Sequence, residues 1–209
     1  MHLKHKPKHE DTHMNHVHIT QGSGKMTGIQ SINTPTSTNE FCLKMRQVKA
    51  NAICKKCYAF RYEKLRPTLV EALKRNLFLA ERYLEVGEIP TISDDIARFD
   101  SYGELINMIH FINYLYIAAG NPHTTFTLWT KRLDIVQEVL LTRTKPDNLI
   151  LIYSSPVVDK QADLPAGFNK VFTSYTRGGA QNINCHGACN TCRLCYSHND
   201  TVNINEIIK

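Results

Sequence analysis

The residues of this chain best suited to chemistry are its seven cysteines, which lie in two separate groups. The C-terminal group has the spacing C-x3-C-x2-C-x2-C and consists of Cys185, Cys189, Cys192 and Cys195. The upstream group consists of Cys42, Cys54 and Cys57. Both groups contain C-x-x-C-Y, a turn that can direct two thiolates at one metal ion. We therefore expect all seven cysteines to be metal ligands.

Disulfide bonds explain these cysteines less well than metal does. The cysteine count is odd, and the polar, Lys/His-rich N-terminus lacks the apolar core of a signal peptide. Disulfides need an oxidising compartment. We expect a cytoplasmic protein.

The metal can be zinc or an iron–sulfur cluster. The spacing of Cys185, Cys189 and Cys192 is the one with which radical S-adenosylmethionine enzymes hold three irons of a four-iron (4Fe–4S) cluster. That motif normally follows the first strand of a barrel, whereas here it lies near the end of the chain, and Cys195 offers a fourth thiolate that would close the site. Cys42, Cys54 and Cys57 are three thiolates that leave one position open, as in catalytic sites. Both metals and both partitions remain open.

Length and charge place the chain among ordinary globular proteins with one notable segment. It has 209 residues, 42% of them hydrophobic, and no apolar run of membrane-spanning length, so we expect no membrane association. The segment Lys44–Arg66 carries eight Lys/Arg and one acid, with tyrosine and phenylalanine between them. Basic and stacking side chains together suit a nucleic acid or nucleotide, although a solvated helix face has the same composition.

The elements that must position the cysteines follow a strand–helix alternation. Residues 1–20 have the composition of a flexible arm that is rich in histidine and lysine, and 21–209 are expected to form one α/β domain with cysteine-rich segments at 42–58 and 185–196. A short strand is expected within residues 29–41. Further strands are expected at 96–99, 124–129, 148–153 and 170–176, and helices at 67–86, 104–119 and 131–142.

This alternation predicts parallel strands with right-handed crossovers. We expect either a partial, half TIM-barrel-like fold or a small parallel sheet with flanking helices. In both, ligands bind beyond the carboxyl ends of the strands. The polar residues expected at that rim, as a substrate or cofactor site, are Asp100, Ser101, Tyr102, Thr130, Lys131, Ser154, Ser155 and Tyr175.

Several segments in order along residues 22–200 resemble the phage "gene product 88" family. They are SGKMTGIQSINT, NEFC, CKKCYA, RFDSYGEL, TLWTKR, NLILIYSS and C-x2-C-R-x-C-Y. The family usually has Ser-Gly-Asp after an early strand, where this chain has Ser101-Tyr102-Gly103-Glu104, so Asp100 and Glu104 are both candidates for that acid. The resemblance implies no assigned reaction. It does imply likeness to phage proteins of radical-SAM-like organisation, which favours iron–sulfur.

Three functions remain. The first is an iron–sulfur, radical-SAM-like enzyme that holds cofactor and substrate, S-adenosylmethionine among the candidates, at the strand ends. The second is a zinc-stabilised nucleic-acid-binding protein that contacts phosphate through Lys44–Arg66. The third is a host-modulating protein that acts through protein contacts, without catalysis. Neither a G-x-S-x-G nor an H-E-x-x-H motif occurs, so hydrolytic chemistry of those kinds is not supported.

Overall fold

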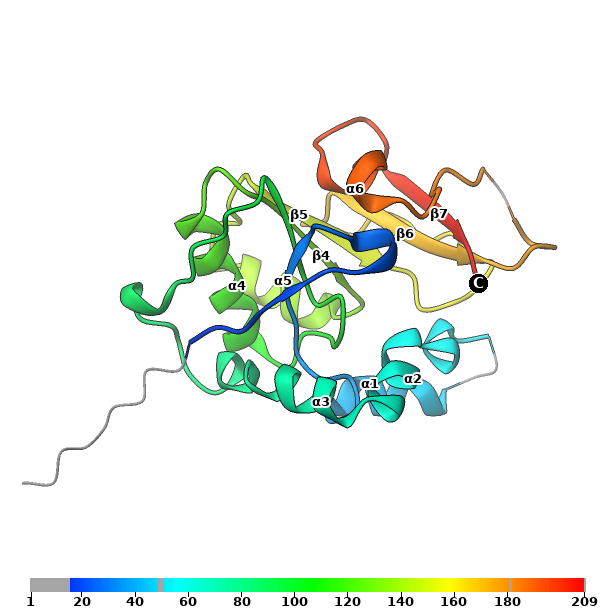
Figure 1. Cartoon of the computed structure of the whole chain (residues 1–209). Coiled ribbons are helices and arrows are strands. Elements are labelled where there is room, and N and C mark those ends of the chain that lie inside the picture. Colours follow the sequence, from blue (N-terminus) through cyan, green and yellow to red (C-terminus); the bar gives the residue numbers. More distant parts are fainter. Residues whose placement is uncertain (1–15, 49–50, 181, 209) are drawn as a thin grey trace, which may run out of the picture.

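A computed structural model describes residues 16–48, 51–180 and 182–208. Its centre is a seven-stranded sheet in the order β1-β2-β3-β4-β5-β6-β7 (Figure 1). β1 is antiparallel to β2, and every other neighbouring pair is parallel. The strands are β1 (Ile19–Gln21), β2 (Gln30–Ile32), β3 (Ile96–Phe99), β4 (Thr125–Thr130), β5 (Leu149–Ser154), β6 (Lys170–Tyr175) and β7 (Asn203–Ile207).

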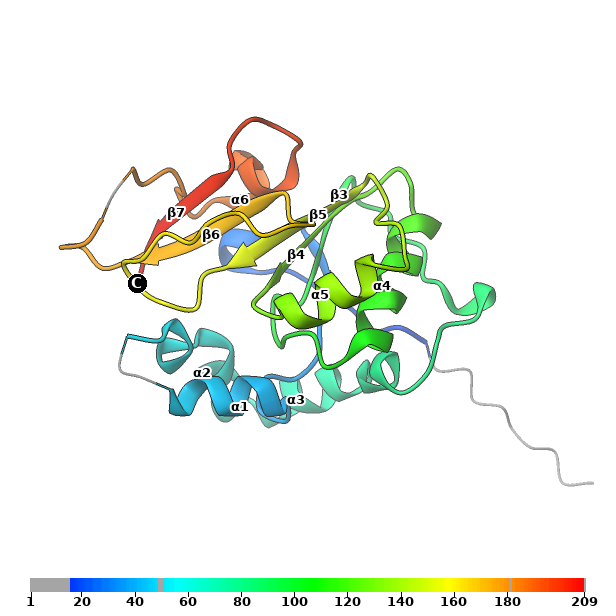
Figure 2. The ribbon, with the colours of Figure 1, turned by 180° about the vertical axis from the view of Figure 1, so that it is seen from behind.

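One face of the sheet, called the helical face below, is covered by α4 (Met108–Gly120) and α5 (Leu133–Leu140) (Figure 2). The main hydrophobic core lies between the sheet and these two helices. At its centre the Phe99 ring stacks on Tyr114 at 4.1 Å and on Phe126 at 4.8 Å between ring centroids. Because the parallel strands β3, β4 and β5 follow chain order, crossovers of one hand place α4 and α5 on the same side.

The opposite face carries a smaller cluster of Met26, Ile29, Ile96 and Tyr196. Trp129, Cys189 and Cys195 pack against this cluster, which places the C-terminal cysteine segment on the face away from α4 and α5. The segment contains a single α-turn, α6 (Cys189–Cys192), and a 3-10 turn, η5 (Leu194–Tyr196). The connection from β6 to β7 therefore covers the face that the helices leave free.

The remaining helices form a lobe beside the carboxyl ends of the parallel strands (Figure 1). They are α1 (Glu40–Gln47), the 3-10 turn η2 (Ile53–Lys56), α2 (Tyr58–Leu65) and α3 (Pro67–Lys74). Three shorter 3-10 turns complete the described elements: η1 (Gly24–Met26), η3 (Leu77–Ala80) and η4 (Val86–Glu88). No helix in the described ranges is long and apolar enough to cross a membrane.

The α/β expectation and its parallel strands are confirmed, but several predicted boundaries are wrong. The helix predicted at 67–86 ends at Lys74. The amide of Asn76 bonds the backbone of His18 and Asn33, which holds the chain against β2 and interrupts the helix. The sheet has seven strands rather than the five predicted. β1 is only three residues long and β7 is largely polar, so both become strands through pairing with their neighbours rather than through local sequence.

The helix predicted at 104–119 begins at Met108, where Asn107 caps it by accepting a hydrogen bond from His110 N at 3.0 Å. The helix predicted at 131–142 is shortened to Leu133–Leu140. In both places the residues freed from the helix, Glu104 and Lys131, point instead into the strand-end region. The last residues of the predicted arm form β1, and the arm's first 15 residues lie outside the described chain.

Candidate metal and ligand site at the strand ends

Cys42, Cys54 and Cys57 all follow β2, the first of the parallel strands. Cys42 lies in the first turn of α1, where its N–H donates to the Asn39 side chain at 3.1 Å. Cys54 lies in η2, and Cys57 is the residue directly before α2. Two short helices and the turn between them therefore present the three thiols at the carboxyl edge of the sheet.

The three thiols form one electrostatic group, called the three-cysteine site below. Burial raises the pKa of the Cys42 thiol, and Glu104 raises it further, while Lys131 opposes the shift and Cys57 and Cys54 add to it. Burial also raises the pKa of Cys54, which Lys131 again lowers and Cys57 raises. The thiols, Glu104 and Lys131 therefore influence one another's charge in the same region of the molecule.

A buried carboxylate fixes the lobe that carries these thiols. Glu63, which is 2% exposed, accepts hydrogen bonds from the backbone N–H groups of Thr36 and Ser37, both at 2.7 Å. Tyr58 directly follows Cys57, and its hydroxyl donates a hydrogen bond to the carbonyl of Ser101. Its ring meets Tyr102 edge-on at 5.9 Å. α2 is thus tied both to the loop after β2 and to the loop after β3.

Glu104 and Lys131 join the ends of neighbouring strands at this site. Glu104 accepts hydrogen bonds from the Thr130 hydroxyl and, at 2.9 Å, from the backbone N–H of Lys131. The Lys131 ammonium donates to the Ser154 hydroxyl at 2.9 Å. Thr130, Lys131 and Ser154 are therefore the predicted rim residues whose polar groups are linked at this site.

The other rim residues also lie at strand ends, but their polar groups are engaged elsewhere. Asp100 has a φ of +49°, and its carboxylate turns toward the helical face, where Tyr114 and Thr34 donate to it. Burial raises the pKa of Asp100 well above its usual value, and Glu104 adds to the shift. Ser101 donates to Asn33, Ser155 donates to backbone carbonyls, and the Tyr175 hydroxyl donates to Gln161.

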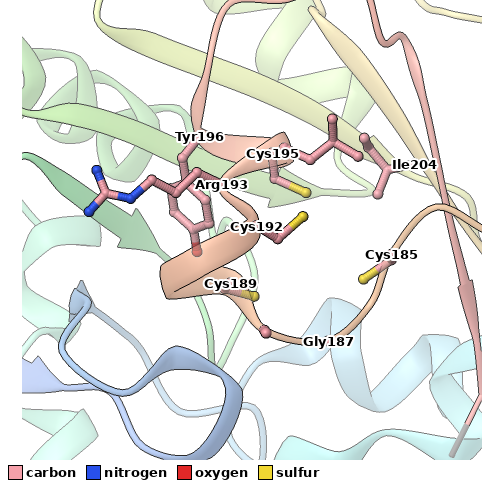
Figure 3. Close-up of a pocket in the computed structure, with 10 residues that line it drawn as sticks. Cys185, Gly187, Cys189, Cys192, Arg193, Cys195, Tyr196 and Ile204 are labelled. Carbon is pink, nitrogen blue, oxygen red and sulfur yellow. The ribbon is translucent and has the colours of Figure 1, made fainter.

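The four C-terminal cysteines line a single pocket, called the four-cysteine site below (Figure 3). Figure 3 shows their side chains arranged around that pocket, with Tyr196 and Ile204 among the residues that close it. Arg193 has a φ of +50°, a left-handed turn that ends α6 and directs Cys195 back toward the other thiols. The chain's local turns therefore bring together the four residues that the spacing predicted.

Burial keeps most of the thiols of the four-cysteine site neutral, and nearby cations oppose this. Burial, followed by Cys185 and Cys189, raises the pKa of Cys195 to about 12 against the opposing effect of Arg98. Lys25 and Arg98 lower the pKa of Cys189, whose shift is otherwise upward through burial. Lys25 also pairs with Glu206 at 2.9 Å. The Cys195 thiol in turn raises the pKa of Lys170, which burial lowers.

Part of the charge of a metal–thiolate centre would be balanced at this site. Lys25 and Lys170 carry two positive charges against the one negative charge of Glu206, a net charge of about +1. Four thiolates around a divalent ion carry about −2. The donor types and the sign of the surrounding charge therefore suit a metal.

The thiols are not spaced as metal ligands as they stand. Within the described ranges, no three His, Cys, Asp or Glu side chains are arranged to hold a metal ion. Metal binding deprotonates thiols and organises sites that are looser without the metal. An ion would have to draw the thiols of each group closer together.

Three residues that were not predicted as site residues contribute to these sites. Glu63 anchors α2, and Arg98 lies beside the four thiols. Glu104, mentioned only as an alternative acid, connects the loop after β3 to the end of β4. The position of Glu104 shortly after a strand could have identified it as a site residue. No sequence pattern identifies Glu63 or Arg98 in this way.

The basic segment forms the outer surface of the lobe. Its described acid, Glu63, is buried and bonded to backbone, whereas six of its cations are exposed. The exposed cations are Lys44, Lys55, Lys56, Arg61, Lys64 and Arg66, and Lys49 lies outside the described residues. The rings between them are covered in part, since Arg46 lies 3.7 Å over Phe60 and Arg66 lies 5.3 Å over Tyr62.

Comparison with known proteins adds a family but no activity. No curated protein and no solved structure matches the chain. The model of the family described as "Gene product 88" matches residues 4–178, which include β1 to β6 and the three-cysteine site but end before the four-cysteine site. The match covers most of the 209 residues, and the chain therefore belongs to the Gene product 88 family.

Proposed function

We propose that this protein is an iron–sulfur enzyme whose reactive centre is the three-cysteine site. Cys42, Cys54 and Cys57 would hold a four-iron cluster with one iron free of protein ligands. Cys185, Cys189, Cys192 and Cys195 would hold a second, closed metal centre. The observation that carries the proposal is the position of the three cysteines after β2, the first parallel strand, where Glu104 and Lys131 from the ends of β3 and β4 act on the Cys42 and Cys54 thiols.

This assignment differs from the motif-based expectation. The spacing C-x3-C-x2-C pointed to the C-terminal group as the open cluster. The position after the first parallel strand, which such clusters occupy in radical-SAM-like organisation, instead belongs to the three-cysteine site. Three thiolates leave a cluster iron free to bind a cofactor or substrate, whereas four close it.

The chain's own residues would bind and orient the ligand at this centre. Lys131 offers a positive charge beside the thiols, and Ser154 holds its ammonium in place. Glu104 fixes the backbone at Lys131 and adds one negative charge. The Tyr58–Ser101 hydrogen bond keeps the thiol-bearing lobe against the strand ends.

Metal and sulfide analysis of protein purified without oxygen tests the proposal. A variant in which Cys42, Cys54 and Cys57 are all replaced by alanine should lose about four irons and four sulfides per chain. It should keep the metal of the four-cysteine site. Addition of S-adenosylmethionine should change the electron paramagnetic resonance spectrum of the reduced wild-type cluster. Protein that contains zinc and neither iron nor sulfide would refute the proposal.

A second candidate, nucleic-acid binding by a zinc-stabilised fold, is favoured by the six exposed cations of the lobe. Binding through phosphates weakens steeply with added salt. Replacement of Lys55 and Lys56 by glutamine should reduce the slope of log K against log salt by about 2, roughly one per contact. Binding that is insensitive to salt, or an unchanged slope, would argue against this candidate. Replacement of Arg143 by glutamine serves as the control, because this exposed arginine follows α5 and lies outside the Lys44–Arg66 segment.

A further inference from the structure

Two cations project from adjacent strands on the face opposite the helices, and neither is paired with a carboxylate. Lys131 follows β4, and Arg98 lies in β3. Neither side chain occurs in the ion pairs found among residues 16–48, 51–180 and 182–208. The Lys131 ammonium donates to the neutral Ser154 hydroxyl. A buried guanidinium nitrogen without a hydrogen-bond partner is costly, so Arg98, with the half-buried Lys131 near it, favours a negatively charged occupant.

Trp129 connects the two cations. Its ring lies 3.9 Å from the Arg98 guanidinium and 5.7 Å from the Tyr196 ring. Side chains two residues apart in a strand share a face at a spacing of about 7 Å, which places Lys131 next to Trp129 on this side. The Ser154 side chain is on the same side, because its neighbour Tyr153 packs into the core of the helical face.

Arg98 has bonding capacity to spare. Its Nε atom is buried and has no hydrogen-bond partner, and one terminal nitrogen meets only the sulfur of Met26 at 3.6 Å. Burial alone would lower the pKa of Arg98, but Tyr58, Tyr196, Cys189 and Cys195 raise it overall. The charge of Arg98 is therefore influenced both by Tyr58, in the lobe of the three-cysteine site, and by thiols of the four-cysteine site.

We propose that Arg98, Trp129, Lys131 and Ser154 form a binding site for a small organic anion, a carboxylate or phosphate carried on a ring that contacts Trp129. Arg98 and Lys131 bind the anionic group, and Ser154 orients the ammonium. This inference names the ligand class of the proposed reactive centre and rests on that proposal for what the ligand does there. The binding itself depends only on the four residues.

Trp129 is the single tryptophan of the chain, so its fluorescence reports on this site directly. The full-length protein, with its metal content measured beforehand, is titrated with four probes that share one nucleoside. Adenosine carries no charge, S-adenosylmethionine and S-adenosylhomocysteine carry a carboxylate together with an ammonium group, and adenosine monophosphate carries a phosphate. At least one probe with an anionic group should bind tenfold or more tightly than adenosine, and the carboxylate and phosphate probes identify which group is bound.

Lys131→Gln should weaken binding of that probe about tenfold or more, since hydrogen bonds to charged groups contribute about 1.5–3 kcal/mol. Arg98→Gln should have a similar effect. Arg143→Gln, a change at an exposed arginine, should have none. Circular dichroism of each variant checks folding, and Lys131→Gln provides the test if Arg98→Gln is unfolded.

Equal affinity for adenosine and the anionic probes, or wild-type affinity in Lys131→Gln, would overturn the anion site. The titration follows Trp129 and not activity, so it separates this inference from the proposed function. Protein that contains no iron but binds the anion through Lys131 would refute only the iron–sulfur proposal. Iron–sulfur protein without Lys131-dependent binding would refute only the anion site.

Discussion

The two cysteine sites differ in what holds them in place. The three-cysteine site rests on elements fixed by other contacts, the Glu63 carboxylate and the Tyr58 hydroxyl among them. The four-cysteine site belongs to a segment with one α-turn and one 3-10 turn, whose thiols themselves pack on the small cluster around Tyr196. The position of the three-cysteine site is thus fixed by contacts of other residues, whereas the cysteines of the four-cysteine site themselves stabilise the segment that contains them.

The largest expected effect is therefore on stability at the four-cysteine site. Cys189→Ser combined with Cys195→Ser should lower the free energy of unfolding by about 3–5 kcal/mol, because the segment loses its metal and its packing together. For a chain of this size that corresponds to a fall in Tm of about 10 °C, measured by circular dichroism. Metal loss with an unchanged Tm would show that the segment needs no metal to stay in place.

The next largest effect should come from the anchor of the three-cysteine site. Glu63→Ala leaves the backbone N–H groups of Thr36 and Ser37 without their acceptor, and it should cost about 2–4 kcal/mol. Metal bound by Cys42, Cys54 and Cys57 should weaken as well, because α2 loses its tie to the loop after β2. Glu71→Ala, on the exposed side of α3, is the matched control in both chemical denaturation and metal titration.

Ionisation of the buried Asp100 carboxyl, at a strand end near the three-cysteine site, should lower the stability of the protein. Its pKa is raised in the folded protein by burial and by Glu104, so the stability it contributes is full below the unfolded pKa and is lost as pH rises through the folded pKa. Asp100→Asn, which tolerates the positive φ, should remove that loss. Urea unfolding between pH 5 and 8 should show the variant gaining on the wild type as pH rises; parallel pH profiles would contradict this account.

The smallest effect on stability is expected from the thiols of the three-cysteine site themselves. Cys57→Ser should abolish its metal centre while it changes the free energy of unfolding by no more than about 1 kcal/mol, since α2 is held by Glu63 and Tyr58. The measurement pairs metal analysis with thermal unfolding of the same sample. A loss of stability as large as that of the four-cysteine variant would erase the distinction between the two sites.

Much of this architecture could be predicted from the sequence because it depends on local pattern. The apolar run Leu149–Tyr153 and the β-branched run Thr125–Thr130 identify buried strands, and the cysteine spacing identifies both groups of thiols. Strand order and the ends of the helices depend on distant partners. β7 has the sequence Asn-Ile-Asn-Glu-Ile and becomes a strand only by pairing with β6.

The candidate site could be predicted in part for the same reason. Lys131 and Ser154 follow strands and could be named in advance. Which rim residues face the thiols could not be predicted, because the positive φ of Asp100 and the hydrogen bond of Tyr175 to Gln161 reverse or divert side chains that simple alternation would direct elsewhere. The spacing of the C-terminal cysteines points to a different group from the one proposed to hold the open cluster, since spacing carries no information on position in the sheet.

The placement of Tyr196 on Met26, Ile29 and Ile96 has a consequence for synthesis of the chain. Residues at the beginning of the sheet receive their cover from a segment near the C-terminus. A chain emerging from the ribosome can pair its early strands and dock α4 and α5, because domains fold as their sequence becomes available. Its opposite face, however, stays exposed to other molecules until the last strand-to-strand connection has been made. The cysteine segment can therefore cover this face only after β1 to β6 have all been synthesised.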